Sequence, residues 1–513
     1  MALDYETYEA AAESFSWDER WELFDGDTES FNITHECIDR RDDDSTAVRL
    51  KFGTGETATY TSGEIGRAAN QFANALSERG LEKGDRIAVM LDPCYELYVG
   101  MFGIWKFGGV FVQLSPMFGP DAVEYRLDDS DADVVLTTKS AAEETVPEDA
   151  AVEVVTVEED FEDLLAGQPT EYEATTGAKD ISAIQYTSGT SGKPSATEMR
   201  HETITYVAVR SMFAYGIRAE DRFFCTSSPA WAHGLWIGTT APLALDTAVG
   251  AYSGAFDPET ALDALEEFEI TNLAAAATAF RKIKTSGLLD EYDLKLKRVA
   301  TAGEAMDTET QAFFQEQLGV QVADVYGVSE FGGMIMNYNG FDGWEMKLGS
   351  IGKPFPGLTV AVIDEEGEEC PPDEIGEIAV ERGGEWFRTG DAGMVDEDGY
   401  YWHKGRKDDV IISSGYRIDP HEVEDSLLAV PEVVEAAVIE SPDEERGNIV
   451  KAYVKVEGEH SDDLKDDIKT SVKEDLSRHE YPRELEFVQE FPRTEAGGKI
   501  QRNKLRELDA NEA

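Results

Sequence analysis

The segment 185–201, which reads QYTSGTSGKPSATEMRH, gathers side chains that could hold a phosphate chain. It places three threonines, three serines and two glycines around Lys193, directly after the apolar-leaning run ISAI. In such a loop the glycines let backbone N–H groups converge on an anion, and the hydroxyls supply further donors. The segment therefore predicts a phosphate-binding loop, with a polar surface turn as the alternative.

A Walker phosphate loop is excluded by the spacing of these residues. That motif needs four residues between its first glycine and its Gly-Lys pair, and it leads straight into a helix. Here Gly189 precedes Gly192 by only three positions, and Pro194 follows Lys193. The order of residues instead resembles YTSGTTGxPKG, a motif of the adenylate-forming enzymes, the superfamily of acyl-CoA synthetases, luciferases and peptide-synthetase adenylation domains.

Five further segments resemble later motifs of that superfamily, in the order in which the superfamily has them. They are AGE at 302–304, DVYGVSEFG at 324–332, WFRTGDAG at 386–393, GRKDDVIISSGYRIDPHEVE at 405–424 and FPRTEAGGKIQR at 491–502. By this resemblance the chain is identified as a member of the superfamily over essentially its whole length.

The resemblance assigns residues to the nucleotide. It implies that Tyr326 lies against the adenine, that Asp391 accepts hydrogen bonds from the ribose hydroxyls, and that Glu330 helps to hold Mg²⁺, a hard cation that prefers oxygen ligands. The whole implied cofactor-binding set is Thr187, Ser188, Gly189, Thr190, Ser191, Gly192, Lys193, Gly303, Glu304, Asp324, Tyr326, Gly327, Ser329, Asp391, Arg406 and Gly415. Taken singly, Asp391 could be a turn aspartate and Arg406 a surface charge, and only the order of the motifs favours the binding roles.

The implied chemistry follows from the poor leaving group of a free carboxylate. Attack of the carboxylate on the α-phosphate of ATP gives an acyl-adenylate and pyrophosphate, so that AMP becomes the later leaving group. Because two anions must approach each other, the protein has an electrostatic task that suits Lys, Arg and Mg²⁺. The resemblance makes Lys499, Glu330 and Arg417 the catalytic residues, with Lys499 bridging the carboxylate and the α-phosphate.

The same resemblance implies two domains, an N-terminal AMP-binding domain at 1–407 and a C-terminal domain at 408–513, with Asp408 as the hinge. Rotation about the hinge would withdraw Lys499 and bring Gly415 beside a tunnel for the pantetheine arm of CoA. Glycine suits that position because a side chain would obstruct a thin ligand. The expected cofactors are therefore ATP, Mg²⁺ and CoA.

One position departs from the family pattern. The family has a lysine after the proline of the loop, whereas this chain has Ser195 after Pro194. Lys193 or Arg200 could supply the missing charge, or pyrophosphate release could differ. A degenerate homologue without activity is the alternative, but Glu330, Asp391 and Lys499 all remain.

The substrate is predicted from segments outside these motifs. The runs FNITHECIDRR at 31–41 and CTSSPAWAHGLWIG at 225–238 resemble acetyl-, propionyl- and medium-chain acyl-CoA synthetases. Acetate-specific relatives have a tryptophan where this chain has Gly327, so we expect a deeper acyl pocket, lined by Trp231, Ala232, His233 and Gly327. We expect broad tolerance from butyrate to octanoate, because a methylene discriminates by only about 1–3 kcal/mol. Benzoate-like acids are the alternative, and a non-CoA adenylating enzyme or a luciferase-type oxidoreductase are alternatives of another class.

The elements that must position these residues alternate in type along the first 330 residues. Short apolar runs such as GDRIAVML and ADVVLTT predict buried strands, and Ile65, Ala69, Phe72 and Leu76 recur at helical spacing after a Thr61/Glu64 capping box. Strands alternating with helices predict an α/β fold with two mostly parallel, covered sheets. From LTVAVIDEEG to GYYWHKG, short strands broken by acidic and glycine turns predict a small antiparallel, barrel-like subdomain.

The last part of the chain predicts a small, mobile α+β domain. PHEVEDSLLAV and DDLKDDIKTSVKEDL read as amphipathic helices, the second with Leu464, Ile468, Val472 and Leu476 on one face. Two apolar runs between them, VVEAAVIE and IVKAYVKVEG, read as strands.

Composition limits the partners and the location of the protein. The 105 acidic against 45 basic residues give a net charge of −60 spread over the whole chain, which predicts a salt-adapted protein and argues against binding to nucleic acid. Cys37, Cys94, Cys225 and Cys370 lie far apart, so we expect neither disulfides nor a metal cluster. The acidic N-terminus and the lack of a long apolar run predict a cytoplasmic protein without a membrane segment, whose partners are a carboxylic acid, ATP and CoA.

Overall fold

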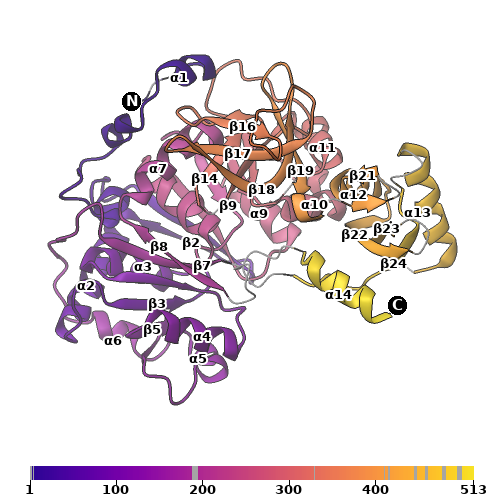
Figure 1. The fold of residues 1–513 in the computed structure, drawn as a ribbon. Helices are drawn as coiled ribbons and strands as arrows, with labels where there is room; N and C mark the ends of the chain where they lie inside the picture. The colour runs from indigo at the N-terminus through magenta and orange to yellow at the C-terminus, as the bar shows by residue number, and fades with distance from the viewer. Residues whose placement is uncertain are drawn as a thin grey trace. The chain divides into compact units, whose positions relative to one another are not determined.

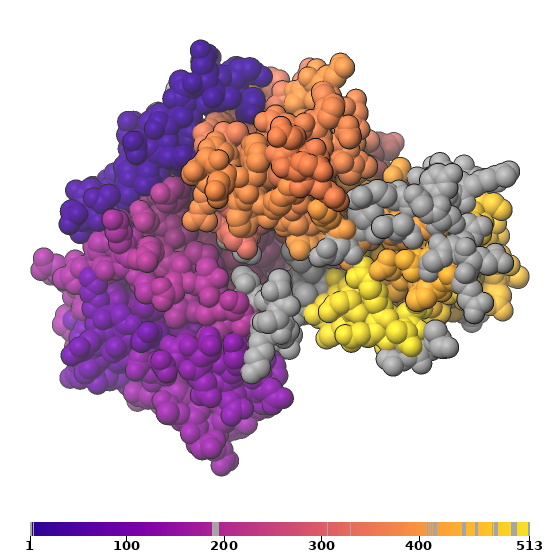
Figure 2. All heavy atoms as spheres, viewed as in Figure 1, coloured from indigo at the N-terminus to yellow at the C-terminus, as the bar shows by residue number. Residues whose placement is uncertain are grey.

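The computed structural model of the 513-residue chain describes residues 3, 5–187, 194–304, 306–328, 330–409, 411–413, 416–443, 447–456, 460–476, 481–493 and 500–512. Contacts divide the chain into two compact units. The first contains Met1–Ala279, Leu288–Ala300 and Tyr338–Trp344, and the second contains Phe280–Gly287, Thr301–Asn337 and Glu345–Ala513. Figure 2 shows the first unit mainly in indigo to magenta and the second in salmon to yellow.

The first unit contains a six-stranded sheet in the order β6-β5-β3-β4-β7-β8 (Figure 1). Its strands are β3 (Arg86–Met90), β4 (Val110–Leu114), β5 (Val134–Thr137), β6 (Glu153–Thr156), β7 (Ile181–Thr187) and β8 (Ser195–Arg200). All pairs are parallel except β7 with β8. The helices between these strands are α3 (Tyr95–Phe107), α4 (Pro120–Ser130), α5 (Lys139–Thr145) and α6 (Phe161–Leu165). This is the predicted α/β arrangement.

A second set of strands in the first unit is ordered β2-β1-β10-β9-β11. Its members are β1 (Thr46–Phe52), β2 (Thr57–Thr61), β9 (Arg222–Cys225), β10 (Ala248–Ser253) and β11 (Asn272–Ala275), and only β1 with β2 is antiparallel. The helices of this part are α1 (Tyr8–Ser14), η1 (Trp17–Leu23), η2 (His35–Asp39), α2 (Ser62–Glu78), α7 (Thr203–Arg210), η3 (Ser211–Tyr215), η4 (His233–Thr240), α8 (Ala241–Ala244), α9 (Pro258–Glu267) and η5 (Leu289–Glu291). Helix α10 (Ala277–Ser286) and strand β12 (Arg298–Ala302) contain residues of both units.

The start and the buried face of α2 confirm the sequence prediction. The Thr61 hydroxyl accepts from the Glu64 amide, and the Glu64 carboxylate accepts from the Thr61 amide, which completes a capping box. The four apolar residues at helical spacing, Ile65, Ala69, Phe72 and Leu76, are all buried. The helix therefore begins at its cap and packs its apolar stripe inward.

The second unit begins with α11 (Thr308–Leu318) and the antiparallel strands β13 (Val322–Val328), β14 (Gly332–Met336) and β15 (Lys353–Pro354). The predicted small antiparallel subdomain is a four-stranded sheet in sequential order, made of β16 (Val360–Ile363), β17 (Gly376–Arg382), β18 (Glu385–Val395) and β19 (Tyr401–Arg406). One apolar cluster joins this sheet to β14 through buried residues such as Met334, Ile378 and Tyr401. The two sheets of this unit therefore share a core.

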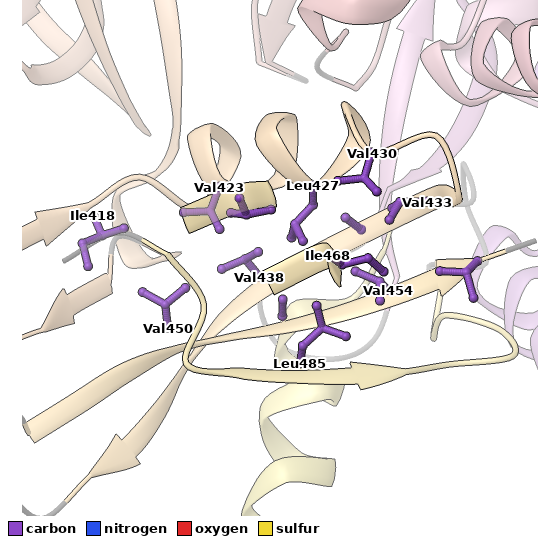
Figure 3. Packing of buried hydrophobic residues seen from close by; sticks show 14 of the residues in the cluster. Ile418, Val423, Leu427, Val430, Val433, Val438, Val450, Val454, Ile468 and Leu485 are labelled. Carbon is purple, nitrogen blue, oxygen red and sulfur yellow. The ribbon is translucent and has the colours of Figure 1, made fainter. Parts of the chain in front are cut away.

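The last segment of the second unit has the predicted α+β composition. It contains η6 (Lys407–Asp409), β20 (Ile411–Ser413), β21 (Tyr416–Ile418), α12 (Pro420–Leu428), β22 (Val433–Asp443), β23 (Gly447–Val456), α13 (Asp462–Asp475), β24 (Glu484–Phe487) and α14 (Arg502–Glu512). Figure 3 shows its core, in which Ile468 of α13 packs with Leu427 of α12 and with Val438 and Val454 of the sheet. Ile468 and Val472 are fully buried, and Leu464 and Leu476 pack partly buried against them, as the helical spacing predicted.

The structure corrects the extent of the predicted phosphate-binding loop. Residues on both sides of it form a hairpin, because β7 ends at Thr187 and β8 begins at Ser195, with these two residues paired. The polar run 195–200 is an edge strand, so its serine, threonine and glutamate side chains can face water and leave no apolar alternation for sequence reasoning to detect. A strand after the loop, rather than a helix, agrees with the exclusion of a Walker motif.

The four cysteines are free thiols, as predicted. Among the described residues, no helix has both the length and the apolar character needed to cross a membrane.

Candidate active site

Asp391 is the centre of a polar cluster between two strands of the second unit. Its carboxylate accepts a hydrogen bond of 2.7 Å from the Tyr326 hydroxyl and one of 3.2 Å from the Arg406 guanidinium. The Nε2 atom of His403 lies 3.9 Å from the same carboxylate. Asp391 is only 5% exposed, so a buried anion is held by two hydrogen bonds and a nearby imidazole.

The strand pairing explains why these side chains meet. Asp391 on β18 is directly opposite Arg406 on β19, and a register shift follows it before Gly393 pairs with His403. Such a bulge turns a side chain out of the regular alternation. The amide of Asp391 is fixed by the Thr389 hydroxyl at 3.2 Å, so the carboxylate is aimed by its own strand.

The cluster controls the charge of its members. Burial by itself would raise the pKa of Asp391, but His403, the Tyr326 hydrogen bond and the charge of Arg406 bring that pKa below its usual value. Burial and the neighbouring Asp391 carboxylate raise the pKa of Tyr326. Burial lowers the pKa of His403, although Asp391 opposes this. At neutral pH Asp391 is therefore an anion and Tyr326 a neutral donor.

Arg406 differs from its partners because 52% of its side chain is exposed. A guanidinium has five N–H donors, and only one bond from Arg406 to Asp391 is found among the described residues. A cation with donors to spare beside a buried carboxylate suits a ligand that carries both hydroxyl groups and negative charge. The side-chain chemistry fits the ribose and phosphates of a nucleotide.

Asp324 binds the turn at 303–306 to strand β13. Its carboxylate accepts backbone hydrogen bonds from Met306 and Val325, and burial nevertheless raises its pKa to about 7. Gly303 in that turn has φ +94°, and the side chain of Glu304 lies 3.5 Å from the Arg281 guanidinium. Asp324 thus fixes the backbone at Met306, two residues after the predicted adenine-contacting turn, in which no atom lies within 4 Å of a Cβ placed on Gly303.

Gly327 lies where β13 and β14 approach most closely. A Cβ atom on Gly327 would meet the carbonyl oxygen of Gly332 at 2.0 Å and the Cα of Gly333 at 2.8 Å. Because both neighbours are backbone atoms, any side chain here requires one strand to move. The close approach of β13 and β14 therefore requires glycine at position 327, whatever effect a side chain there would have on a substrate pocket.

The predicted site residues fall partly within and partly outside the described chain. Ser188, Gly189, Thr190, Ser191, Gly192, Lys193, Ser329, Gly415 and Lys499 lie outside the described residues. Thr187 is the last residue of β7, Arg417 lies in β21 opposite Ile412 of β20, and Asp408 lies in η6. Of these three residues only the backbone is described. Glu330 is exposed in the turn that joins β13 to β14.

Arg200 was predicted as one substitute for the missing loop lysine, and this is wrong. In the β7–β8 hairpin Arg200 pairs with Ile181, the first residue of β7, whereas Ser195 pairs with the last. Five residues of extended strand separate it from Ser195 by about 17 Å. Arg200 instead donates to the carbonyl of Lys179 at the opposite end of the sheet.

His233, one of the predicted acyl-site residues of the first unit, has a hydroxyl group near each of its ring nitrogens. The Nδ1 atom of His233 lies 3.0 Å from the Ser227 hydroxyl, and its Nε2 atom lies 3.4 Å from the Tyr215 hydroxyl. Burial lowers the pKa of His233 to about 4, so the ring is neutral at physiological pH. A neutral imidazole between two hydroxyl groups can orient a polar group but does not attract an anion by charge.

The backbone beside His233 is unusually close to another segment. A Cβ on Gly234 would lie 2.0 Å from the carbonyl oxygen of Ser228, so only glycine allows this approach. The helix that begins at His233 has π geometry, which is rare and often found at functional sites. The backbone conformation of residues 232–234 therefore requires glycine at position 234.

Trp231 packs against the core of the six-stranded sheet. Its ring lies edge-on to Phe118 with 5.5 Å between centroids, and the Arg126 guanidinium lies over the Phe118 ring, 4.0 Å from its centroid. Ala232 is exposed. Trp231 therefore has a packing role, and only part of its surface remains for a substrate.

Two buried amides connect the strand of the phosphate-binding loop to this acyl segment. Gln185 on β7 donates to the Gln113 side chain on β4 at 2.6 Å, and Gln113 donates to the Pro229 carbonyl at 2.6 Å. These glutamines and His403 were not predicted. His403 could have been found, because it pairs with Gly393 across β18 and β19 on a diagonal to Asp391. The glutamine contacts join residues 72 and 116 positions apart and carry no local signal.

Comparison with known proteins gives the family. Residues 36–385 match the family described as AMP-binding enzyme, and residues 422–498 match the AMP-binding enzyme C-terminal domain. The chain belongs to the AMP-binding enzyme family.

Relatives of established name place it among the acyl-CoA synthetases. The acetyl-coenzyme A synthetase of Bacillus subtilis is 32% identical over 98% of this chain and 95% of its own. The mitochondrial acyl-coenzyme A synthetase ACSM3 of Rattus norvegicus is 30% identical over 93% of this chain and 90% of its own. The crystal structure of the anthranilate CoA ligase AuaEII with anthranoyl-AMP is 28% identical with a TM-score of 0.85, covering 94% of this chain and 99% of that one.

The chain is thus an AMP-forming acyl-CoA synthetase in class, a ligase that uses a carboxylic acid, ATP, Mg²⁺ and CoA. Among the described residues there is no cluster of three or more metal-binding side chains. Mg²⁺ in such a site takes most of its ligands from water and from the phosphates of the substrate, which fits this donor set.

Proposed function

We propose that the protein converts short- to medium-chain carboxylic acids, with ATP and CoA, to acyl-CoA, AMP and pyrophosphate through an acyl-adenylate. The observation that carries the proposal is the Tyr326–Asp391–Arg406 cluster, a buried acceptor beside an exposed cation. Asp391 would accept hydrogen bonds from the two ribose hydroxyls, and Arg406 would contact the same ribose. Because these groups are held by their strands before the nucleotide arrives, little entropy is lost on binding.

The charged steps are assigned mainly to residues outside the described part of the chain. We propose that Lys499 neutralises the substrate carboxylate and the α-phosphate as they approach, and that the loop Thr187–Lys193 and Ser329 orient the phosphates. Arg417 would contact the phosphate, and Glu330 would hold Mg²⁺ from the exposed turn after β13.

The second half-reaction needs a different arrangement of the C-terminal domain. We propose boundaries at 1–407 and 408–513 with Asp408 as the hinge, and that Gly415 lines the path of the pantetheine arm. Lys499→Ala should abolish adenylate formation and leave thioester formation from supplied acyl-AMP largely intact. Gly415→Leu should do the reverse, and equal loss of both steps in either variant would contradict the assignment.

The acid preference is proposed from the acyl segment. Short- to medium-chain acids are supported by the resemblance of segments 31–41 and 225–238 to acetyl-, propionyl- and medium-chain acyl-CoA synthetases. Aromatic acids are a second candidate, because the solved structure with a TM-score of 0.85 is an anthranilate CoA ligase. CoA-dependent release of AMP, measured with acetate, butyrate, octanoate, benzoate and anthranilate, separates them. The highest kcat/KM with butyrate or octanoate would support the first candidate, and the highest kcat/KM with benzoate or anthranilate would support the second. Release of AMP without CoA would indicate another class of adenylating enzyme.

We also propose that the protein works in a salt-rich cytoplasm. A net charge of −60 repels itself at low ionic strength, and this repulsion is screened over about 3 Å at molar salt. Activity and melting temperature should therefore rise toward molar KCl. Unchanged activity in low-salt buffer would contradict this proposal and leave the reaction class untouched.

A further inference from the structure

A cavity of about 420 Å³ opens at the amino ends of β3, β4 and β7 in the first unit. Its charged lining consists of Lys83, Arg86, Lys179, Asp180, Glu198 and Arg200. Its volume lies within the usual range for small-molecule sites, about 300–1,000 Å³. The cavity is therefore large enough for a small organic anion and larger than a bare inorganic ion needs.

The charge of this lining is opposite to that of the chain. Lys and Arg make up 45 of the 513 residues, about one in eleven, yet they supply four of the eleven residues that line the cavity. Asp and Glu supply two of the eleven, which is close to their share of the whole chain, 105 of 513, so the lining differs from the chain by its added cations. The net charge of the chain is strongly negative. Four clustered cations against two carboxylates nevertheless give this lining a positive local potential.

Two of the four cations are fixed in place by the backbone. The Lys83 ammonium donates to the Thr175 carbonyl at 2.9 Å and pairs with Asp180 at 2.7 Å. The Arg200 guanidinium donates to the Lys179 carbonyl. Asp180 in turn accepts from the Gly177 amide at 2.8 Å, so this carboxylate is already satisfied. Lys83, Asp180 and Arg200 are thus held in position before any ligand binds.

The other two cations have free donors. Among the described residues, the side chains of Arg86 and Lys179 form no hydrogen bond or ion pair. Arg86 is the first residue of β3, and its backbone, not its side chain, binds Asp133. Two uncompensated cations beside two fixed ones form a donor set for a multiply charged anion.

The floor of the cavity is apolar. Val110, Ile181 and Ile184 line it, and Ile184 belongs to the buried core of the sheet. A neighbouring cavity at the starts of β5 and β6 has the opposite character, since Asp85, Asp133 and Glu153 line it against Arg79 alone. The basic lining is therefore a local feature of three strands, not a general property of this edge of the sheet.

The position of the cavity separates it from the catalytic phosphates. Lys179 and Arg200 lie beside Ile181, the first residue of β7, whereas the predicted phosphate-binding loop follows Thr187, the last residue, six residues along the strand. Six residues of extended strand span about 20 Å. On β7 the lining extends to Ile184, about 10 Å short of Thr187, and does not include Thr187.

We propose that this cavity is a second anion site, which binds a phosphate-bearing molecule through Arg86, Lys179 and Arg200 and places a small apolar part on Val110 and Ile181. The proposal does not depend on the acid that the enzyme activates. The shared chemistry is a phosphate group, and its source could be inorganic phosphate, pyrophosphate or a nucleoside monophosphate.

The test is isothermal titration calorimetry of the full chain, with the catalytic site filled by a non-hydrolysable acyl-sulfamoyl adenosine. Inorganic phosphate, pyrophosphate and AMP are the three probes, at constant KCl. The proposal predicts one binding event per chain for at least one probe, weakened about ten-fold for each cation removed in Arg86→Gln and Arg200→Gln. Glu198→Gln should tighten binding, because it removes the only carboxylate of the lining that has no partner among the described residues.

Lys139→Gln is the matched control, since this exposed lysine is paired with Glu159 and lies outside the cavity lining. It should bind like the wild type. Absence of binding by all three probes, or equal binding in the wild type and in Arg86→Gln/Arg200→Gln, would overturn the proposal. If the adenosine analogue itself fails to bind, the proposed function is wrong, and the anion site is then read from the loss of one bound probe per chain in the double variant.

Discussion

Asp391 in the second unit and His233 in the first are both polar side chains that the family resemblance marks, but their neighbours differ in kind. Asp391 is held by other functional side chains, Arg406 on the adjacent strand β19 and Tyr326 on β13 of another sheet. The segment of His233 is shaped by a glycine against a backbone carbonyl, by Trp231 packing on Phe118 and by amides from distant strands. A nucleotide is the same for every enzyme of the family and can have a fixed set of binding residues, whereas an acyl pocket varies through its packing.

Removal of the Asp391 carboxylate should have the largest effect. Asp391→Asn weakens two hydrogen bonds to a buried anion and the proposed bonds to the ribose, and charged hydrogen bonds contribute about 1.5–3 kcal/mol each. We expect a loss of about 100-fold or more in kcat/KM for ATP with no change in the order of preferred acids. Asp398→Asn, an exposed acid just beyond β18, is the control and should stay near wild type. A changed acid preference in Asp391→Asn would contradict the division between the two regions.

The reciprocal change in the acyl segment is Gly234→Ala. The new Cβ would lie 2.0 Å from the Ser228 carbonyl, and overpacking of this kind costs about 1–3 kcal/mol. We expect a lower free energy of unfolding in urea and an altered acid preference, with KM for ATP unchanged. Gly119→Ala, where no atom lies within 4 Å of the added Cβ, should be neutral in both measurements. If Gly234→Ala raised KM for ATP alone, the acyl assignment of this segment would be wrong.

Tyr326→Phe should affect the Tyr326–Asp391–Arg406 cluster less than Asp391→Asn does. It removes one donor to Asp391 and leaves the ring in place, so we expect about a ten-fold loss of kcat/KM for ATP, equivalent to ~1.4 kcal/mol. The pKa of Asp391 should rise, because one of its stabilising bonds is lost. Carbon-detected NMR titration of the carboxylates would show this, and an unchanged Asp391 titration would mean that the hydrogen bond is not made in solution.

The last expected effect concerns stability alone and is a pH dependence from His233. Its pKa falls to about 4 in the folded protein, below the unfolded value of about 6.5. The unfolded chain therefore binds more protons between these values, and stability falls as the pH drops from 6.5 to 4, by at most ~1.4 kcal/mol per pH unit. His233→Gln should reduce that slope, measured as the change in the free energy of unfolding with pH. Equal slopes in wild type and His233→Gln would show that the ring is accessible to water.

The same contrast explains how much could be predicted from the sequence. Short-range signals were sufficient for α2, whose cap and buried face follow from Thr61, Glu64 and four apolar residues, and for α13. They were insufficient for β8, a polar edge strand, and for the Gln185–Gln113–Pro229 contacts. Asp391 and Tyr326 were predicted because the family motifs mark them, but their mutual hydrogen bond depends on a bulge between β18 and β19 that no spacing along the chain indicates.

The central claim is that a carboxylate oxygen of the substrate attacks the α-phosphate of ATP, and transfer of ¹⁸O tests it most directly. With doubly ¹⁸O-labelled butyrate, ATP and CoA, the account predicts that AMP acquires one ¹⁸O atom per turnover, because the bond between the acyl carbon and that oxygen breaks when CoA attacks. Mass spectrometry of the nucleotide product measures this. Unlabelled AMP, or ADP as the product, would contradict the account.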